Sequence, residues 1–502
     1  MTYLVGIDLG TEGVRVGLFD ESGQQVGTAS EAIRTSIPGS ARAEQDPDEW
    51  WIALGRATRA VLAGVDSSGI GGLCVSTTSS TVVACTRLGI PLRPAIMWMD
   101  TRAWREAEDS KAIEHDVMRF SGGSDAAEWL APKAAWLCRN EPEEYAKADY
   151  IVEALDFLNF RLTGEWSSSL MNATCKANYD PIHRCYHSHI FSELGAEGLE
   201  GKLPDKIIRV GDPVGTLTPA AADHLGINGR PIVAQGGIDA HMAMLGGGHP
   251  HPGSVFMIAG TSNVQLALTE EILDIDGMWG PYPDALVPGL SLIEGGQISA
   301  GSILRWITRD LLQLPEDEAA KLAALPTVSP TGPSSLLVLD YWMGNRTPYR
   351  DDRLRGSVLG LSLNHSPADI YRAAVESIAF GTRNVLDSFE QAGLATDRVI
   401  VSGGIRHNPL WLQTTADVLG RPIEFCDESN LTTLAGAISA ATALDRYDSL
   451  ASASQSMGAQ TRTVTPTPGT ATGHDHKYAL YLQATTALSN TLHDLVNLTE
   501  VR

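Results

Sequence analysis

The chain has 502 residues, too many for one ordinary hydrophobic core, so we expect two large domains. Hydrophobic residues make up 43% and charged residues 19% of the chain, which is typical of a soluble globular protein and excludes a disordered one. With 60 acidic and 37 basic side chains the formal net charge is −23, and such a surface repels nucleic acid and acidic membranes, so we expect neither as a partner. A nucleotide is not excluded, because local backbone donors and a metal ion can overcome the global field.

The cysteines and the apolar segments indicate the cellular compartment of the protein. The 6 cysteines show no C-x-x-C pair and no spacing suited to zinc or to a disulfide framework, so we expect reduced thiols. No signal peptide is recognisable at the start, and no apolar run approaches the roughly 18 residues that a membrane-spanning helix needs. We therefore expect a cytoplasmic enzyme.

A predicted hairpin opens the chain. Residues 4–19 combine a buried strand, a turn between Gly10 and Gly13, and a strand that alternates apolar and polar side chains. A glycine-containing tip such as Gly10-Thr11 directs backbone N–H groups outward, which suits phosphate oxygens, and the nearby carboxylate of Asp8 could hold the accompanying magnesium. An ordinary hairpin with a polar tip is the alternative interpretation.

The same pattern returns in the second half of the chain. Residues 255–268 again read as strand, Gly260-Thr261 and strand. Aligning the two Gly-Thr pairs gives two halves of about 250 residues, as an internal duplication of one α/β unit would. Two such turns facing each other across a cleft would hold a nucleotide from both sides. A Walker-type P-loop is excluded, because residues 198–203, its nearest look-alike, lack the spacing and the hydroxyl.

Polar side chains that could bind a sugar follow several apolar segments. Residues 76–81, a serine and threonine run that includes Thr77, end a short apolar strand where α/β sheets bind ligands, although a polar turn is the commoner meaning of such a run. Farther along, Trp98 and Asp100 could stack on a polyol and hydrogen-bond it. A surface ion pair between Asp100 and Arg102 would explain these charges equally well.

Three more charged residues are candidates. Asp239 follows paired glycines and is the candidate catalytic base. Glu294 precedes two glycines, where a sugar could approach the backbone closely. Lys176 lies among small polar residues, where a lysine is usually solvated.

A glycine turn between a strand and a helix is the candidate nucleotide site of the second half. The strand at residues 398–401 runs into Gly403 and Gly404, and a helix starts at Asn408. Free N–H donors and the helix dipole point outward at such a place, although a plain α/β turn has the same pattern.

The remaining pattern concerns helices and the domain boundary. A capping box at Ser366 predicts a long helix through residue 391. Residues 450–475, rich in serine, threonine, proline and glycine, predict a solvated loop, and a last helix is expected at residues 477–498. The His-Pro-His-Pro run after residue 248 predicts the boundary between domains 1–248 and 249–502.

Taken together, five motifs resemble the FGGY carbohydrate kinases, and they occur in order across nearly the whole chain: Gly6-Ile-Asp8-Leu-Gly10-Thr11, Trp98-Met-Asp100-Thr-Arg102, Gly236-Gly-Ile-Asp239-Ala, Gly260-Thr261-Ser262 and Ser402-Gly-Gly404-Ile-Arg-His-Asn408-Pro409. The resemblance implies an α/β fold of two actin-like (RNase H-like) domains with an interdomain active-site cleft. The N-terminal domain would carry the sugar site, the first phosphate hairpin and the catalytic aspartate. The C-terminal domain would bind ATP.

Within that family the chain looks most like the ribulokinase branch, on Ile238-Asp239-Ala240-His241, Ile293-Glu294-Gly-Gly-Gln297, Thr174-Cys175-Lys176, Gly344-Asn345-Arg346-Thr-Pro348 and Leu354-Arg-Gly356. Xylulokinase relatives typically carry Met-His where this chain has Thr77-Thr78. Ribulokinases usually have Asp-Ala where it has Ser76-Thr77, so the exact sugar stays open.

The resemblance also assigns roles. Asp239 would take the proton of a terminal sugar hydroxyl as it attacks the γ-phosphorus of MgATP. The other residues fall into four groups, namely Lys176, Glu294, Thr77, Trp98 and Asp100 for the polyol, Gly10, Thr11, Gly260 and Thr261 for the phosphates, Asp8 for Mg²⁺, and Gly403, Gly404 and Asn408 for adenosine.

The acceptor implied is a pentulose, most of all L- or D-ribulose. Xylulose, ribitol, a tetrulose or glycerol are the alternatives, and a non-catalytic actin-fold protein that binds sugar and nucleotide is a distant one. Homodimers are common in the family, so a homodimer is a possible assembly.

Overall fold

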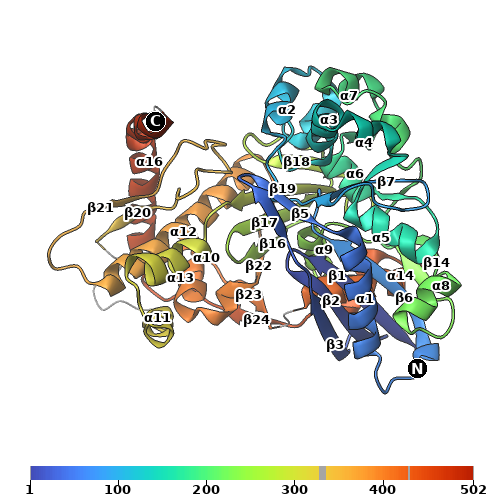
Figure 1. The fold of residues 1–502 in the computed structure, drawn as a ribbon. Coiled ribbons are helices and arrows are strands. Elements are labelled where there is room, and N and C mark those ends of the chain that lie inside the picture. The colour runs from blue at the N-terminus through green and yellow to red at the C-terminus, as the bar shows by residue number, and fades with distance from the viewer. Residues whose placement is uncertain (1, 327–334, 428–429, 501–502) are drawn as a thin grey trace.

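The computed structural model describes residues 2–326, 335–427 and 430–500. Two large mixed sheets dominate it, one from each half of the chain (Figure 1). The first sheet has the strand order β14-β15-β6-β1-β2-β3. Its strands are β1 (Tyr3–Gly10), β2 (Gly13–Asp20), β3 (Gln25–Ala32), β6 (Ile70–Thr77), β14 (Pro213–Thr216) and β15 (Ile232–Ala234).

The second sheet has the order β18-β19-β17-β16-β22-β23-β24. Its strands are β16 (Ser254–Ala259), β17 (Asn263–Thr269), β18 (Trp279–Pro283), β19 (Ser291–Gln297), β22 (Arg398–Ser402), β23 (Ile423–Cys426) and β24 (Thr461–Val464).

The two sheets repeat one topology. β1 pairs antiparallel with β2 and parallel with β6, and β16 pairs antiparallel with β17 and parallel with β22. A second parallel strand and an antiparallel edge strand then follow on the same side in both sheets. The Gly10-Thr11 and Gly260-Thr261 turns therefore occupy equivalent positions, which confirms the predicted duplication at the level of strand order.

The face on which a side chain lies follows from the period of two along each central strand. On β1, Val5, Ile7 and Leu9 are buried in the cluster that contains α1 (Pro47–Val61). Leu4 points to the opposite face, in a second cluster that joins both halves of the chain. Asp8 is four residues after Leu4 on the same strand, so its side chain lies on the face between the two halves.

Two helices fill the space between the sheets. α9 (Asp239–Gly246) follows β15, α14 (Leu431–Ala443) follows β23, and the two pack against each other. α14, although late in the chain, also packs on β1 and β6 of the first sheet. A Cβ on Gly6 would lie 1.7 Å from the carbonyl oxygen of Thr433, so glycine is required for this close approach.

A smaller lobe extends from the first half and carries the sheet β4-β5-β8-β7-β9 (Figure 1). Its strands are β4 (Ser36–Gly39), β5 (Arg42–Gln45), β7 (Val82–Cys85), β8 (Ala95–Ile96) and β9 (Tyr150–Glu153). Its helices are α2 (Trp104–Asp109), α3 (Leu130–Asn140), α4 (Pro142–Lys147) and α7 (Ser188–Leu194), and the short hairpin of β11 (Tyr179–Asp180) and β12 (Cys185–Tyr186) lies beside them.

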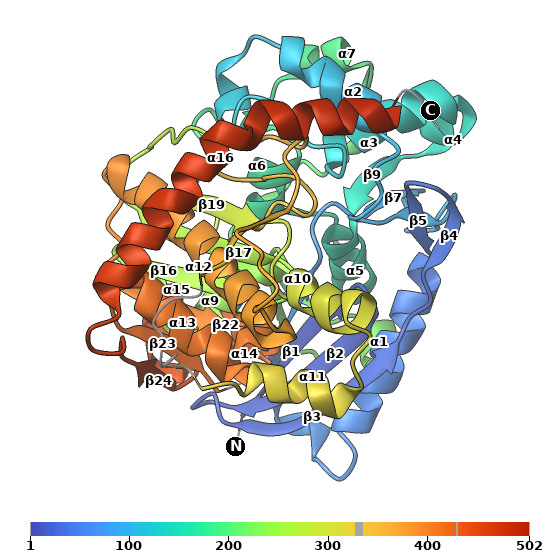
Figure 2. The same cartoon turned by 90° about the vertical axis from the view of Figure 1, so that its left-hand side faces the viewer.

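The other elements flank the two large sheets. They are α5 (Ala154–Thr163), β10 (Ser168–Ser169), α6 (Leu170–Lys176), β13 (Ile207–Ile208), α8 (Pro219–Leu225), α10 (Gly301–Arg305), α11 (Glu316–Ala323), β20 (Leu337–Leu339), β21 (Ser357–Leu359), α12 (Pro367–Gln391), α13 (Pro409–Leu419), α15 (Leu450–Met457) and α16 (Ala471–Glu500). Figure 2 shows α16 crossing the outer side of the C-terminal half as one long helix.

The helix predictions are partly confirmed. The capping box of Ser366 with Asp369 starts α12 as predicted. The loop expected at residues 450–475 is wrong, because a second capping box, Ser449 with Ser452, starts α15 there, and β24 then pairs with β23. The last helix, expected from residue 477, begins six residues earlier. In the described parts of the chain, no helix is both long and apolar enough to cross a bilayer.

Candidate active site

A cavity of about 260 Å³ lies between the two halves of the chain. The first half contributes the end of β1 and the start of α9, and the second half contributes the turn after β22 and the start of α14. Its walls are formed by Asp8, Arg15, Asp239, Ala240, Ala243, Ile258, Ser402, Gly403, Arg406, Asn430, Leu431, Thr432 and Thr433.

Among the residues that the structure describes, Asp8 is one of two carboxylates that line this cavity. It is 2% exposed, and its Oδ2 lies 2.7 Å from a guanidinium nitrogen of Arg15, which faces it across the β1–β2 hairpin. Burial raises the pKa of Asp8 and the charge of Arg15 opposes that rise. Within the described residues its Oδ1 is buried and has no hydrogen-bond partner, so this oxygen is free for a ligand of the cavity.

Asp239, the first residue of α9, is the second carboxylate. Its Oδ1 accepts a hydrogen bond from the backbone N–H of Ala240 at 2.7 Å. Burial, followed by the negative charge of Asp8, raises the pKa of Asp239 to about 7. A carboxylate with such a pKa accepts a proton at neutral pH far better than an ordinary aspartate does.

The turn after β22 forms the opposite wall. Gly403 has φ of +87°, and a Cβ there would lie 2.7 Å from the carbonyl oxygen of Ala259. Only glycine adopts this conformation in this space, which lets the backbone of the turn line the cavity.

A buried cluster of charged side chains includes His241 in the first turn of α9. The Nζ of Lys176 is 3.7 Å from Oε2 of Glu294, and Nε2 of His241 is 3.1 Å from the same oxygen. Although burial opposes it, the charge of Lys176 and the His241 hydrogen bond together lower the pKa of Glu294 to about 2. The ammonium group also lies 4.7 Å from the ring centroid of Trp129, within cation–π range. The structure therefore brings Lys176 and Glu294, distant in sequence, into one contact.

Two family models match the chain, one after the other. The N-terminal domain of the FGGY family of carbohydrate kinases matches residues 3–246, and the C-terminal domain of the same family matches residues 255–444. The chain belongs to this FGGY family. It is therefore a carbohydrate kinase, with a sugar and ATP as substrates, as the sequence motifs predicted.

Curated relatives of this FGGY kinase cover almost its whole length. An FGGY carbohydrate kinase domain-containing protein of Xenopus laevis is 31% identical over 96% of both chains. A ribulokinase of Mycolicibacterium smegmatis is 30% identical over 96% of this chain and 93% of its own.

Solved structures agree on the fold. A xyloylose kinase from Brucella ovis superposes with a TM-score of 0.88 at 27% identity, covering 97% of this chain and 100% of its own. A xylulose kinase from Lactobacillus acidophilus reaches a TM-score of 0.88 at 21% identity over 99% of this chain and 100% of its own. The predicted α/β fold of two actin-like domains is thus confirmed.

Both phosphate-binding turns predicted in this FGGY kinase lie outside the lining of the cavity. Thr11 accepts a hydrogen bond at Oγ1 from the indole N–H of Trp98 at 2.9 Å, so the first turn is tied to a predicted sugar residue. In the second turn the N–H of Gly260 donates to the carbonyl of Ser262, and the carbonyl of Thr261 accepts from Ala300. Their contact with phosphates stays a prediction, as does that of Gly10.

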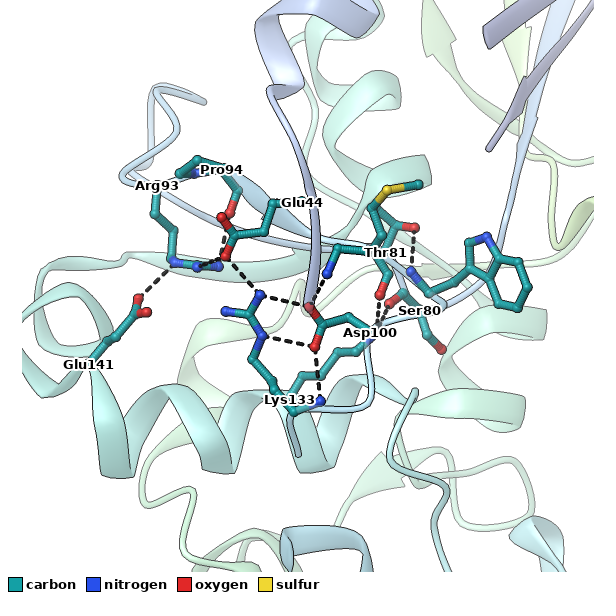
Figure 3. Close-up of polar contacts among 12 residues, drawn as sticks. Glu44, Ser80, Thr81, Arg93, Pro94, Asp100, Lys133 and Glu141 are labelled. Carbon is teal, nitrogen blue, oxygen red and sulfur yellow. Dashed lines mark hydrogen bonds and ion pairs between the residues drawn. The ribbon is translucent and has the colours of Figure 1, made fainter. Parts of the chain in front are cut away.

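Asp100 is placed in a buried network of the smaller lobe (Figure 3). It is 0% exposed, and both of its carboxylate oxygens accept hydrogen bonds, from Arg102 and from the backbone N–H of Ala43. Arg102 also pairs with Glu44, which in turn pairs with Arg93. Asp100 and Arg102 therefore form an ion pair, but the pair is buried inside the protein and does not lie on its surface. Through Ala43 it connects this segment to β5.

The hydroxyl groups at the end of β6 are also turned inward. Thr77 is fully buried and its Oγ1 donates to the carbonyl of Thr78 at 2.9 Å. Nearby, the buried Nζ of Lys133 donates to the carbonyls of Ser80 and Met97 (Figure 3). The sugar contact predicted for Thr77 remains a prediction.

Among the predicted adenosine residues, Asn408 has a structural function of its own. Its Oδ1 accepts from the N–H of Trp411 and so caps α13, while its Nδ2 donates to the hydroxyl of Tyr371 at 2.9 Å. Gly403 lines the cavity, whereas Gly404 starts the short turn that leads to Asn408.

Sequence reasoning missed Arg15 and Thr433, which both line the cavity. Arg15 had a signal, because a hairpin with Gly10 opposite Gly13 places Asp8 opposite Arg15. Thr433 had none, since its position depends on how α14 of the second half packs on β1.

Proposed function

We propose that this FGGY kinase transfers the γ-phosphoryl group of MgATP to a terminal hydroxyl of a pentulose, and that the pentulose is ribulose. The observation that carries the catalytic part is the carboxylate of Asp239 in the cavity between the halves, with a pKa of about 7. Phosphoryl transfer needs mainly positioning, charge neutralisation and a base for the attacking hydroxyl.

Asp239 is the base of this mechanism. Its carboxylate accepts the proton of the sugar hydroxyl as the oxygen attacks the γ-phosphorus and the bond from that phosphorus to ADP breaks. The hydrogen bond from Ala240 and the position at the start of α9 fix the direction of the carboxylate.

Asp8 fits the magnesium that accompanies ATP. It offers a buried carboxylate oxygen that has no hydrogen-bond partner among the described residues, and oxygen is the ligand that Mg²⁺ prefers. When bound, Mg²⁺ neutralises charge on the phosphates. Arg15 beside Asp8, and Arg406 on the opposite wall, add positive charge to the same cavity.

The two halves divide the work between them in this proposal. Residues 1–248 supply the base and most of the sugar site, to which Glu294 is added from the second half, and residues 249–502 bind ATP. Glycine turns at equivalent places of the two sheets, Gly10-Thr11 and Gly260-Thr261, support this division, because each half then supplies one turn whose backbone N–H groups suit phosphate oxygens.

The cluster of Lys176, Glu294 and His241 carries the choice of sugar. An ammonium group and an ionised carboxylate held together in a buried place recognise adjacent hydroxyl and carbonyl groups, which a ketose such as ribulose presents. The ribulokinase of Mycolicibacterium smegmatis, 30% identical over 96% of this chain, supports ribulose. The Brucella ovis xyloylose kinase, at 27% identity, supports xylulose as the second candidate.

A panel of acceptors tests the proposal. ADP release from MgATP is measured with L- and D-ribulose, both xyluloses, ribitol, erythrulose and glycerol, and the phosphorylated carbon is assigned by NMR. We expect the highest kcat/KM for one enantiomer of ribulose, with the phosphate on a terminal carbon. A higher kcat/KM for xylulose, ribitol, erythrulose or glycerol would contradict the assignment to ribulose.

A further inference from the structure

A cluster of histidines lies on the smaller lobe, away from the residues that line the active-site cavity. The β11–β12 hairpin carries Asp180 at the end of β11 and His183 in its turn, and His187 follows β12. One ligand atom of each of these three side chains lies within 4.8 Å of the others. Nothing in the phosphoryl transfer described above uses them.

The contacts within the cluster are short and converge on one oxygen. Oδ2 of Asp180 lies 2.7 Å from Nδ1 of His183 and 2.9 Å from Nε2 of His187. The side chain of His183 is 72% exposed and that of His187 is 22% exposed, whereas that of Asp180 is 6% exposed. The two imidazole rings are therefore accessible to solvent, whereas the carboxylate is buried.

The backbone of the turn orients the carboxylate. Oδ1 of Asp180 accepts hydrogen bonds from the N–H groups of Ile182 and His183, at 2.9 and 3.0 Å. These bonds occupy one carboxylate oxygen and direct the other toward the two rings. Such outer hydrogen bonds are what holds a metal-binding carboxylate in place in known sites.

More potential ligands surround the three. The ring of His115 lies 4.4 Å from that of His187, measured between centroids, and the ring of His189 lies 5.0 Å from that of His115. The Sγ of Cys185 is 3.9 Å from Nε2 of His187. Imidazole, carboxylate and thiol groups together are the ligand types of zinc and its neighbours, whereas Mg²⁺ and Ca²⁺ prefer oxygen alone.

We propose that Asp180, His183 and His187 bind a divalent transition-metal ion of the Zn²⁺ class. Two imidazoles and one carboxylate supply three ligands, and water occupies the remaining positions of the metal. The bound ion replaces the present contacts between the carboxylate and the two rings by bonds to one centre, and the exposed His183 has room to make this adjustment.

The position of the site gives it a structural effect on the enzyme. α6 ends at Lys176, and Asp180 follows only four residues later. Between them, Asn178 donates from Nδ2 to the buried Asp125 at 2.9 Å. A metal ion bound to Asp180 therefore restrains the short segment that follows Lys176. Binding to the folded chain also stabilises it, because the unfolded chain has no preformed site.

The test is titration of the full-length protein with Zn²⁺ by calorimetry, after treatment with a chelator, in buffer that contains excess Mg²⁺. We expect one ion per chain and a higher melting temperature in its presence. Two variants test the ligands: His183→Gln, a change at an exposed side chain, and the double variant His183→Gln with His187→Gln. We expect each to lower the Zn²⁺ affinity at least about tenfold, because loss of even an outer partner of a metal ligand lowers metal affinity by that factor.

His251→Gln is the matched control, because it removes an exposed histidine of another segment and leaves the hairpin intact. We expect this variant to bind Zn²⁺ as the wild type does. Circular dichroism of each variant without metal checks that the fold is kept.

Co²⁺ gives a second readout that does not depend on stability. Absorption bands of tetrahedral Co²⁺ are expected with the wild type and with His251→Gln, and their loss is expected in the double variant. Equal Zn²⁺ affinity and equal Co²⁺ spectra in the wild type and the double variant would overturn the proposal. Binding of Zn²⁺ only by displacement of Mg²⁺ from the kinase site, seen as no binding in excess Mg²⁺, would overturn it as well.

Discussion

Asp8 and Asp239 face one cavity, and the charge of Asp8 is a cause of the raised pKa of Asp239, which burial and this charge bring to about 7. β1 supplies the first carboxylate and α9 the second, so among the described residues both carboxylates of the cavity come from the first half of the chain. The pair differs in environment, because Arg15 contacts Asp8 directly. This asymmetry suits a metal-binding role for Asp8 and a proton-accepting role for Asp239.

The first prediction concerns the pH dependence of the kinase. Asp239 must be ionised to act as a base, so kcat/KM is expected to fall as the pH drops through about 7. Asp8→Asn removes a neighbouring negative charge, so the pKa of Asp239 falls and the acid limb of the profile of the residual activity moves to lower pH. Glu12→Gln, at an exposed position of the nearby turn, should leave the limb unchanged. If the acid limb of Asp8→Asn lies at the same pH as that of the wild type, the claim that the charge of Asp8 raises the pKa of Asp239 is contradicted.

The second prediction separates sugar binding from ATP binding. Lys176→Met removes the charge next to Glu294 and keeps much of the side-chain length. We expect the KM of the sugar to rise about 10- to 100-fold, since a hydrogen bond to a charged group contributes about 1.5–3 kcal/mol. The KM of ATP should stay within a factor of about two of the wild type. Lys111→Met, at an exposed lysine, is the control, and equal KM values for the sugar in both variants would disprove the role.

The third prediction distinguishes a structural Asp100 from a sugar-binding one. Asp100→Asn leaves the buried Arg102 with a weakened partner, and breaking a buried ion pair costs about 3–5 kcal/mol of unfolding free energy. Urea denaturation should show this loss, and Asp310→Asn, in an exposed pair, should change the unfolding free energy by less than about 0.5 kcal/mol. A normal unfolding free energy combined with a large rise in the KM of the sugar would show that Asp100 binds the sugar.

The fourth prediction tests the contact between β1 and α14. Gly6→Ala places a methyl group 1.7 Å from the carbonyl oxygen of Thr433, so β1 and α14 must move apart, and α14 carries cavity-lining residues. We expect a loss of at least about 3 kcal/mol in unfolding free energy, the upper range of overpacking, together with weaker ATP binding. Gly201→Ala is the matched control, because nothing lies within 4 Å of its Cβ. Wild-type stability of Gly6→Ala would contradict the close packing.

The repeated hairpins show how much local pattern could predict. A strand, Gly-Thr and a strand occur twice, and the structure places both at the same position of two sheets with one topology. The start of α12 followed from Ser366 in the same way. Such features depend on residues close in sequence, so one sequence is enough to find them.

Contacts between distant segments were the part that could not be predicted. Thr433 reaches the cavity only because α14 packs on β1, and nothing near Thr433 indicates this. Asp100 was a candidate for sugar binding or for a surface ion pair, because Ala43 and Glu44, which enclose it, come from the distant strand β5. The helix α15 was missed for a different reason, since its serine-rich composition hid the capping box of Ser449.

The most direct test of the central claim is the sugar-dependent release of ADP by the wild type and by Asp239→Asn, with ATP binding measured in both. We predict that the rate at saturating substrates falls about 10²- to 10⁴-fold, the usual contribution of a positioned base, while the Kd of ATP changes little. Turnover of Asp239→Asn at the wild-type rate would contradict the assignment of the cavity and of its base.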